Sequence, residues 1–178
     1  MDTEEFWNVM EQARGRAADS TDAEDIARRA TELLAAQEPQ QILDAQQILW
    51  DVMAASYKAP LWAAAYLING GCSDDGFEYF RGWLITQGRT TFDQVVDDAD
   101  RLADLPAVRA AASVGMDLEG ERTLSIAGDA YEKATDAQLP AGCFSINYPP
   151  LDPAWDVDFD DHGRIAARLP RIAALFTD

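Results

Sequence analysis

An uncharged apolar segment near the middle of the chain limits the possible folds more than any other part of the sequence. Leu61 to Ile68 carries no charged side chain and includes three successive alanines. Pro60 precedes it and Gly70-Gly71 follows it, in line with the preference for proline at the start of a helix and glycine after its end. A helix that is apolar on every side is buried on every side, so we expect this segment to lie in the interior, between other helices.

Helix signals also occur along most of the remaining chain. Asp2 and Glu5 have the spacing of a capping box, and Thr21 and Glu24 repeat it ahead of a second apolar stripe. Ser73 is placed to cap a helix whose first turn carries two aspartates. No stretch shows the alternation and glycine-containing hairpins of a β-sheet. The sequence therefore predicts an all-α fold.

The helix that begins after Ser73 carries aromatic and aliphatic side chains over a wide arc. We expect these aromatic rings to pack in the core rather than to line a pocket. The opposite arc carries Asp75, Glu78, Gly82 and Thr86 and predicts a polar strip along this helix. Together with the uncharged segment before it, the helix is expected to form a buried central hairpin.

The composition changes after Leu139-Pro140. Prolines between positions 149 and 153 oppose regular structure. From Asp152 to Asp161, apolar side chains alternate with aspartates, a period of two that predicts an extended strap with its apolar edge on the body. This stretch is termed the acidic strap. Arg164 to Phe176 then predicts a short C-terminal helix broken at Pro170.

The chain has 178 residues and a mass of 19.6 kDa. Surface scaling predicts that folding buries about 70% of the unfolded surface and leaves about 8,600 Å² exposed. A chain of this size is expected to form one domain. Residues 1–140 would be its helical core, and residues 141–178 would be the strap and C-terminal helix, packed on the same domain.

The charge balance excludes several classes of partner. The chain has 14 basic and 32 acidic side chains, a net charge of −18, and a pI near 4.2. So large an acidic excess opposes direct contact with nucleic acid or an anionic membrane, since both need a basic surface. The same field favours a basic protein partner. A hydrophobic fraction of 48% argues against global disorder.

The ends and the cysteines predict a cytoplasmic location. The start, Met1 to Trp7, lacks the basic and apolar regions of a secretory signal. The longest uncharged apolar stretch, Ala59 to Gly70, is too short to cross a bilayer. Cys72 and Cys143 lie far apart, outside any C-x-x-C spacing. A disulfide between them is one alternative, and reduced thiols in a cytosolic protein are the favoured one.

From Leu61 to Arg89 the chain reads LWAAAYLINGGCSDDGFEYFRGWLITQGR. This segment resembles the bacterial family known as domain of unknown function 4240. The resemblance extends over most of the chain, faintly at the two ends, with weaker blocks at Asp100 to Ala103 and at Ala130 to Glu132. Position 99 departs from the family pattern, which usually has proline where this chain has Ala99. The resemblance implies no reaction, cofactor or catalytic residue.

The turn Gly70-Gly71-Cys72-Ser73-Asp74-Asp75, termed the GGCSDD turn, is the first candidate site. A helix N-terminus normally suits anions. Here Asp74 and Asp75 already supply negative charge, so a cation or a ligand amine fits better. Arg81 lies at nearly the same angular position as Asp74, two turns on. The alternative, favoured because structural ion pairs are commoner than sites, is a capped helix whose Arg81 pairs with another helix. The candidate ligand residues are Cys72, Ser73, Asp74, Asp75 and Arg81.

Nucleophilic catalysis and metal binding have weaker support. The one histidine, His162, is expected to be a solvated surface residue, and Cys72 a small buried thiol whose carboxylate neighbours raise its pKa. The series Asp156-x-Asp158-x-Asp160 imitates a calcium loop, but Asp161 replaces its glycine and Ala167 its glutamate. No zinc, phosphate-loop or dinucleotide motif occurs. We expect no metal and no cofactor, and no catalytic residue can be assigned.

The leading hypothesis is a non-catalytic, cytosolic interaction protein that binds a basic protein partner through its acidic surface. A regulatory or immunity-like role follows only by analogy of charge. The alternative is an enzyme or ligand-binding domain with its site at the GGCSDD turn. The sequence does not determine the oligomeric state. The candidate partner contacts lie in the Asp97–Asp104 cluster and the acidic strap: Asp97, Asp98, Asp100, Asp156, Asp158 and Asp160.

Overall fold

The computed structural model describes residues 1–155 and 161–176, apart from the side chain of His162. All regular elements of this part are helices, which confirms the predicted all-α fold. In chain order they are α1 (Thr3–Arg16), α2 (Ala23–Leu34), α3 (Pro39–Ala55), α4 (Ala59–Ile68), α5 (Asp74–Thr86), α6 (Arg89–Asp97), η1 (Ala99–Asp104), α7 (Pro106–Val114), η2 (Glu121–Ser125), α8 (Ile126–Thr135), η3 (Pro153–Trp155), α9 (His162–Arg168) and α10 (Pro170–Phe176).

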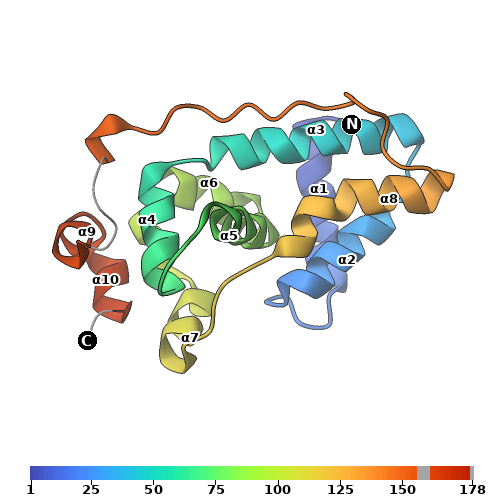
Figure 1. Cartoon of the computed structure of the whole chain (residues 1–178). Helices are drawn as coiled ribbons and strands as arrows, with labels where there is room; N and C mark the ends of the chain where they lie inside the picture. Colours follow the sequence, from blue (N-terminus) through green and yellow to red (C-terminus); the bar gives the residue numbers. More distant parts are fainter. Residues whose placement is uncertain (156–160, 177–178) are drawn as a thin grey trace.

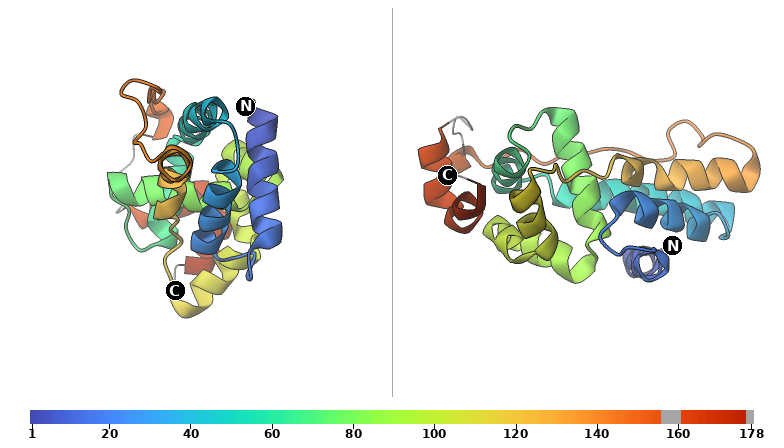
Figure 2. Two further views of the ribbon diagram at one scale, coloured as in Figure 1. Left: turned by 90° about the vertical axis from the view of Figure 1, so that its right-hand side faces the viewer. Right: turned by 90° about the horizontal axis from the view of Figure 1, so that it is seen from below.

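The helices form two groups that meet at α5 (Figure 1). In the first group α1 packs on α2, and α2 and α3 both pack on α8. In the second, α10 packs on η1, α4, α7 and α9. The right-hand view of Figure 2 shows α5 between these groups. Buried apolar side chains of both groups belong to one hydrophobic cluster, so the described chain has a single core.

The helix with the widest set of neighbours is α5, which contacts α1, α2, α3, α4, α6 and η2. The uncharged α4 is buried as predicted, with its alanines against the core. It lies to one side of α5, however, among α7, α10 and η1. Of the two helices in the predicted central hairpin, α5 therefore occupies the centre of the fold, and α4 does not.

Two of the predicted helix starts show how local the capping signal is. Asp2 and Glu5 form the predicted capping box, with reciprocal hydrogen bonds of 2.9 and 2.8 Å. The prediction for Thr21 is wrong by one residue. Asp22 caps α2 and accepts from the N–H groups of Glu24 and Asp25, because its carboxylate oxygen reaches both amides.

The polar strip predicted on α5 is correct for its first half only. Gly82 and Thr86 are buried. Gly120 and Thr123 lie against Gly82, and the Gly120 N–H donates to the carbonyl of Tyr79 at 2.9 Å. A Cβ on Gly82 would lie 2.4 Å from the carbonyl oxygen of Gly120. Here the absence of a side chain is what lets the two backbones meet.

The C-terminal part lies on the body of the same chain. Residues 141–152 run along α3 without regular structure (Figure 1). Helices α9 and α10 are separated near Pro170, as predicted, and their apolar residues Ile165, Leu169 and Ile172 join the common core. Residues 156–160 of the acidic strap lie outside the described residues.

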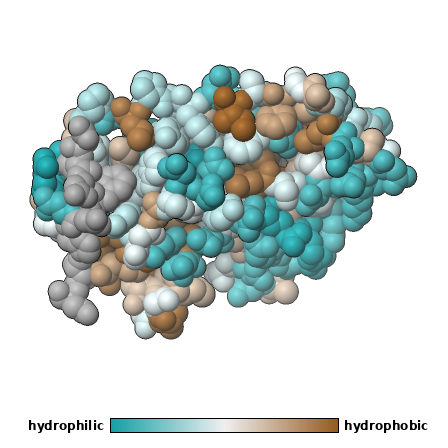
Figure 3. All heavy atoms as spheres, in the orientation of Figure 1, coloured by the Kyte–Doolittle hydropathy of each residue, from teal (hydrophilic) through white to brown (hydrophobic). Residues whose placement is uncertain are grey.

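The face of the molecule shown in Figure 3 carries mainly polar residues on one side and scattered apolar residues between polar ones elsewhere. The folded chain exposes 8733 Å², close to the value expected for its mass. An exposed apolar tip occurs at the end of α7, where Val114 is 72% and Met116 54% exposed. Among the described helices none has the length and apolar character needed to span a membrane. Cys72 and Cys143 are free thiols.

Candidate functional site

The GGCSDD turn is shaped by its own backbone. Gly70 and Gly71 have φ values of 66° and 139°, in the region that favours glycine. A Cβ at either position would meet nothing within 4 Å, so neither glycine marks a close approach of other atoms. The Ser73 side chain accepts from the Gly76 N–H at 3.1 Å and caps α5 as predicted. The turn reverses the chain and starts a helix.

The thiol of Cys72 is half-buried beside this turn. Burial, followed by the negative charge of Glu119, raises the pKa of Cys72 to about 12. Since the thiolate is the nucleophile, a thiol with this pKa is protonated and unreactive near neutral pH. The thiol is thus half-buried rather than buried as expected.

The adjacent carboxylates Asp74 and Asp75 face different hollows. Asp74 lines a small cavity of about 220 Å³ together with Glu78 and Arg81. Asp75 lines a larger cleft of about 590 Å³ together with residues of α2 and η2. Glu78 borders both. The structure therefore divides the predicted site between two cavities.

Arg81 is 1% exposed and is held by another helix, as the structural interpretation of the sequence expected. Its Nη1 donates to the carbonyl of Met53 in α3 at 2.7 Å, and its Nε donates to Phe77 at 3.2 Å. Its guanidinium lies over the rings of Phe77, Tyr57 and Tyr148 at 4.6–5.3 Å. These contacts make Arg81 the best-anchored charged group in this region.

The small cavity has a mixed wall. Trp62, Tyr57 and Tyr148 line it beside the carboxylates of Asp74 and Glu78. Trp62 is half-buried, stacks on the buried ring of Phe77 at 4.8 Å and also borders this opening. Aromatic faces next to carboxylates suit a small cationic group. Arg81 supplies the one positive charge on this wall.

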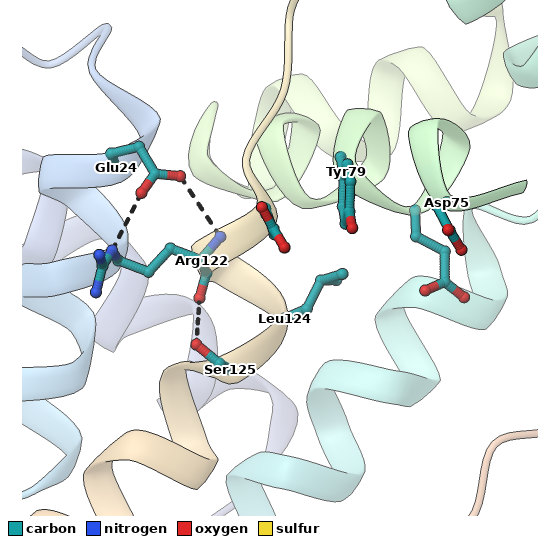
Figure 4. Close-up of a pocket in the computed structure, with 8 residues that line it drawn as sticks. Glu24, Asp75, Tyr79, Arg122, Leu124 and Ser125 are labelled. Carbon is teal, nitrogen blue, oxygen red and sulfur yellow. Dashed lines mark hydrogen bonds and ion pairs between the residues drawn. The ribbon is translucent and has the colours of Figure 1, made fainter. Parts of the chain in front are cut away.

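The larger hollow is an acidic cleft between α2, α5 and η2 (Figure 4). Tyr79 and Asp75 project into it from α5, and Glu24 borders it from α2. The one basic lining residue, Arg122, points toward α2, where its Nε donates to Glu24 at 3.1 Å. The full lining is Glu24, Asp75, Glu78, Tyr79, Glu121, Arg122, Leu124 and Ser125.

Negative charge accumulates in and around the acidic cleft. Asp75 and Glu121 have no basic partner within the described part of the chain. The charge of Glu121, and then burial, raise the pKa of Tyr79. Burial, and then the charges of Asp117 and Glu121, raise the pKa of the nearby Glu119. The pKa shift of Tyr79, which has the charge of Glu121 as its largest cause, agrees with an excess of negative charge in the cleft. A cationic group would offset this charge.

Sequence reasoning missed this cleft because three distant segments build it. Glu24 and Arg122 are 98 positions apart, yet they form an ion pair. Pairs of neighbouring acidic residues in the sequence did not predict this cleft, since a chain with 32 acidic residues contains many such pairs by chance. Only Asp75 belonged to the predicted site.

The predicted partner-contact aspartates of the Asp97–Asp104 cluster have different surroundings. Asp97 is exposed at the edge of a third hollow. Asp98 caps η1 by accepting from the N–H of Asp100 at 3.1 Å. Asp100 accepts from the N–H groups of Arg171 and Ile172 at 3.0–3.2 Å and so caps α10. Two of these three aspartates thus stabilise the fold itself.

The remaining partner-contact candidates, Asp156, Asp158 and Asp160, lie outside the described residues, as does the imitation of a calcium loop that they form. The side chain of His162 is likewise not described. Within the part that the structure describes, no group of three or more His, Cys, Asp or Glu side chains is arranged to hold a metal ion.

The fold and its hollows define an all-α, single-domain protein with an acidic cleft. The chain belongs to the family described as Protein of unknown function (DUF4240), which matches residues 1–133 and confirms the resemblance. No curated protein and no solved structure matched the chain. The matched part includes every residue of the acidic cleft and ends before the segment that runs along α3.

Proposed function

We propose that this protein is a non-catalytic, cytoplasmic interaction domain that binds a basic segment of a partner protein in the acidic cleft. The observation that carries the proposal is the lining of the cleft. Four carboxylates surround Tyr79, and the one basic lining residue is already paired with Glu24. A lysine or arginine side chain of a partner would supply the missing positive charge.

The chemistry of the cleft supports a cationic side chain in particular. Carboxylates form short, charge-assisted hydrogen bonds with ammonium and guanidinium groups. The ring of Tyr79 offers a face on which a guanidinium can stack. The net charge of −18 adds a long-range field that speeds the approach of a basic partner. Asp97 and the acidic strap remain candidates for outer contacts.

A charge-matched pair of variants tests this proposal. The first, Asp75→Asn/Glu121→Gln, removes two charges from the cleft. The second, Asp93→Asn/Glu132→Gln, removes two from exposed positions elsewhere. We expect the unaltered chain and the second variant to co-purify with a stoichiometric basic partner at low salt, and the first variant to lose it. Equal retention by both variants, or no partner at low and moderate salt, would contradict the proposal.

A second candidate function has an observation of its own. The cavity of about 220 Å³ beside the start of α5 is lined by Asp74, Glu78 and Arg81, which supports a ligand-binding or enzymatic role at the GGCSDD turn. Its carboxylates, Asp74 and Glu78, and the aromatic wall suit a small amine.

Adjacent aspartates provide the control for this second candidate. In a thermal-shift screen of small amines, a ligand of this cavity should stabilise the unaltered chain and the Asp75→Asn variant. It should not stabilise Asp74→Asn, since only Asp74 lines the small cavity. The absence of any stabilising ligand, or equal shifts in all three chains, would count against this function.

A further inference from the structure

Residues 143–150, termed the YPP segment, form an extended stretch that runs along α3 (Figure 1). Two aromatic side chains, four positions apart, attach it to the body. Phe144 stacks on Trp50 of α3 with ring centroids 6.2 Å apart, and Tyr148 stacks on Tyr57 at 4.5 Å. The three residues between these anchors are exposed. The segment thus contacts the body in the way a bound peptide does, through spaced side chains.

The side-chain amide of Gln47 pairs with the backbone of Ser145 in both directions. Its Oε1 accepts from the Ser145 N–H at 2.8 Å, and its Nε2 donates to the Ser145 carbonyl at 3.2 Å. An amide that satisfies both polar groups of one extended residue imitates the pairing supplied by a neighbouring β-strand. This contact involves only the backbone of the segment, so it does not depend on the side chain at position 145.

The second anchor, Tyr148, enters a polar socket. Its hydroxyl donates to Glu78 Oε1 at 3.0 Å and accepts from Arg81 Nη2 at 3.4 Å. Its ring lies 4.9 Å from the Arg81 guanidinium carbon. A phenylalanine at this position would leave both polar groups without this partner. The socket therefore distinguishes tyrosine from other aromatic residues.

Two residues of this socket, Arg81 and Tyr57, also have contacts within the body. The ring of Tyr57 packs against Trp62 and Phe77. Arg81 donates to the carbonyl oxygens of Met53 and Phe77, and Tyr57 lies immediately after α3. Side chains with such contacts lose less conformational entropy when an occupant enters.

The groove continues past Tyr148. Pro149 and Pro150 border a hollow of about 420 Å³ whose other wall includes Tyr57, Pro60 and Val96. Consecutive prolines favour the polyproline II conformation, which docks against aromatic and apolar surfaces at low entropic cost. Pro149 and Pro150 are exposed beside this hollow and extend the segment past the socket.

The residues that form the groove lie inside the part of the sequence that matches the family, and the segment that occupies the groove lies outside that part. Gln47, Trp50, Tyr57, Glu78 and Arg81 lie within the matched residues 1–133, and the YPP segment lies beyond them. We propose that this face of α3, α4 and α5 is a binding groove for an extended peptide. The peptide has two aromatic residues four apart, the second a tyrosine followed by two prolines. This chain's own residues 143–150 occupy the groove in cis, so a partner's segment of the same pattern must displace them.

A full-length release variant, Phe144→Ser/Tyr148→Ser, tests the groove with a labelled peptide of residues 141–152 that carries C143S. A tethered segment competes at an effective concentration on the order of millimolar. The release variant should therefore bind the peptide at least about tenfold more tightly than the unaltered chain. Equal affinities, or no binding to either chain, would overturn the proposal. A peptide with Tyr148→Ala should not bind.

Two glutamines of α3 give a matched control within the release variant. Gln47 donates to Asp51 at 2.8 Å and Gln40 donates to Asp44 at 2.9 Å, but only Gln47 reaches the YPP segment. Gln47→Ala should weaken peptide binding about fivefold, as expected for one lost hydrogen-bonding group, and Gln40→Ala should leave it unchanged. Equal effects would overturn the proposal.

The mass of the complex in solution shows whether the peptide or a second copy of the chain occupies the groove. A complex of one chain with one peptide supports the groove as proposed, whereas a release variant that only dimerises would show that a second copy fills it and would overturn the proposal.

If the release variant does not fold, the unaltered chain is titrated with peptide to about 1 mM, near the effective concentration of the tether. A shift of the Trp50 indole NMR signal supports the proposal and its absence overturns it. The acidic cleft shares Glu78 with the socket but contains neither Gln47 nor Trp50, so the effects of Gln47→Ala and the Trp50 signal distinguish this proposal from the basic-partner proposal.

Discussion

Arg81 is a residue whose role was open in the sequence and is clear in the structure. A guanidinium that is 1% exposed has lost nearly all its hydration, so its hydrogen bonds and aromatic contacts must compensate. The nearest carboxylate oxygen, of Glu78, lies 3.9 Å away, and the backbone carbonyl of Met53 lies closer at 2.7 Å. Arg81 therefore ties α5 to the end of α3.

Replacing Arg81 should destabilise the fold. Arg81→Met removes donors from the carbonyls of Met53 and Phe77, and we expect the free energy of unfolding to fall by about 2–4 kcal/mol. Asp75→Asn, in the same helix but facing the acidic cleft, should change it by less than about 0.5 kcal/mol. Urea unfolding followed by circular dichroism measures both. Similar effects of the two variants would refute this role of Arg81.

Gly82 provides a second prediction at the residue scale. Gly82→Ala would place a Cβ 2.4 Å from the backbone oxygen of Gly120, and we expect a loss of about 1–3 kcal/mol or more. Gly15→Ala is the control, because its Cβ meets nothing within 4 Å in helix α1. That variant should gain about 0.5–1 kcal/mol. Thermal unfolding of the two variants should move in opposite directions.

The thiol of Cys72 gives a prediction about reactivity. In a Cys143→Ser background at about pH 8, alkylation of folded Cys72 by iodoacetamide should be on the order of a thousandfold slower than that of an unperturbed thiol. The reason is its pKa of about 12, which leaves almost no thiolate. The rate should keep rising with pH well above neutrality. A rate that levels off near pH 7 would instead indicate an activated nucleophile.

At the scale of elements, the described caps explain why helix starts were predictable. A cap depends on a few neighbouring residues, so Ser73 and the Asp2–Glu5 pair were found from spacing alone. The cap of α10 was not predictable, since Asp100 lies 71 positions before the amide it accepts from. The same aspartate was expected to face a partner.

Removing that distant cap should loosen α10. Asp100→Ala leaves the N–H groups of Arg171 and Ile172 without their acceptor, and we expect a loss of about 1 kcal/mol. Asp93→Ala removes only an exposed pair with Arg89 and should cost less than about 0.5 kcal/mol. Hydrogen exchange of α10 amides, read together with thermal unfolding, distinguishes the two. Unchanged exchange in Asp100→Ala would refute the capping role.

At the scale of the whole molecule, the dominant electrostatic property is self-repulsion. A net charge of −18 disfavours the compact state, and the described ion pairs are mostly exposed and individually weak. Raising ionic strength from about 0.01 to 0.15 M shortens the Debye length from about 30 to 8 Å. We therefore expect the melting temperature to rise by a few degrees with salt, as measured by calorimetry. A fall would mean that ion pairs outweigh repulsion.

The pH dependence follows from two opposite pKa shifts. The raised pKa of Glu119 means that the folded chain holds more protons than the unfolded chain, so stability should rise as the pH falls from neutral toward about 5. The hydrogen bond from Arg171 lowers the pKa of Asp104, so its contribution is lost when the pH falls further, below about 4. Melting temperatures across this range should pass through a maximum on the acid side of neutrality.

The sequence alone determined the all-α class, the burial of α4, several helix caps, and the family. These properties depend on composition and on residues within one or two turns of each other, so their signals are local. Only the tertiary structure decided that Asp74 and Asp75 line different hollows and that Glu24 forms an ion pair with Arg122. It also decided that the backbone of Gly120 lies against Gly82 and that Tyr148 contacts Arg81. Such contacts join segments tens of positions apart, and their geometry follows from how whole helices pack, which no local pattern of residues encodes.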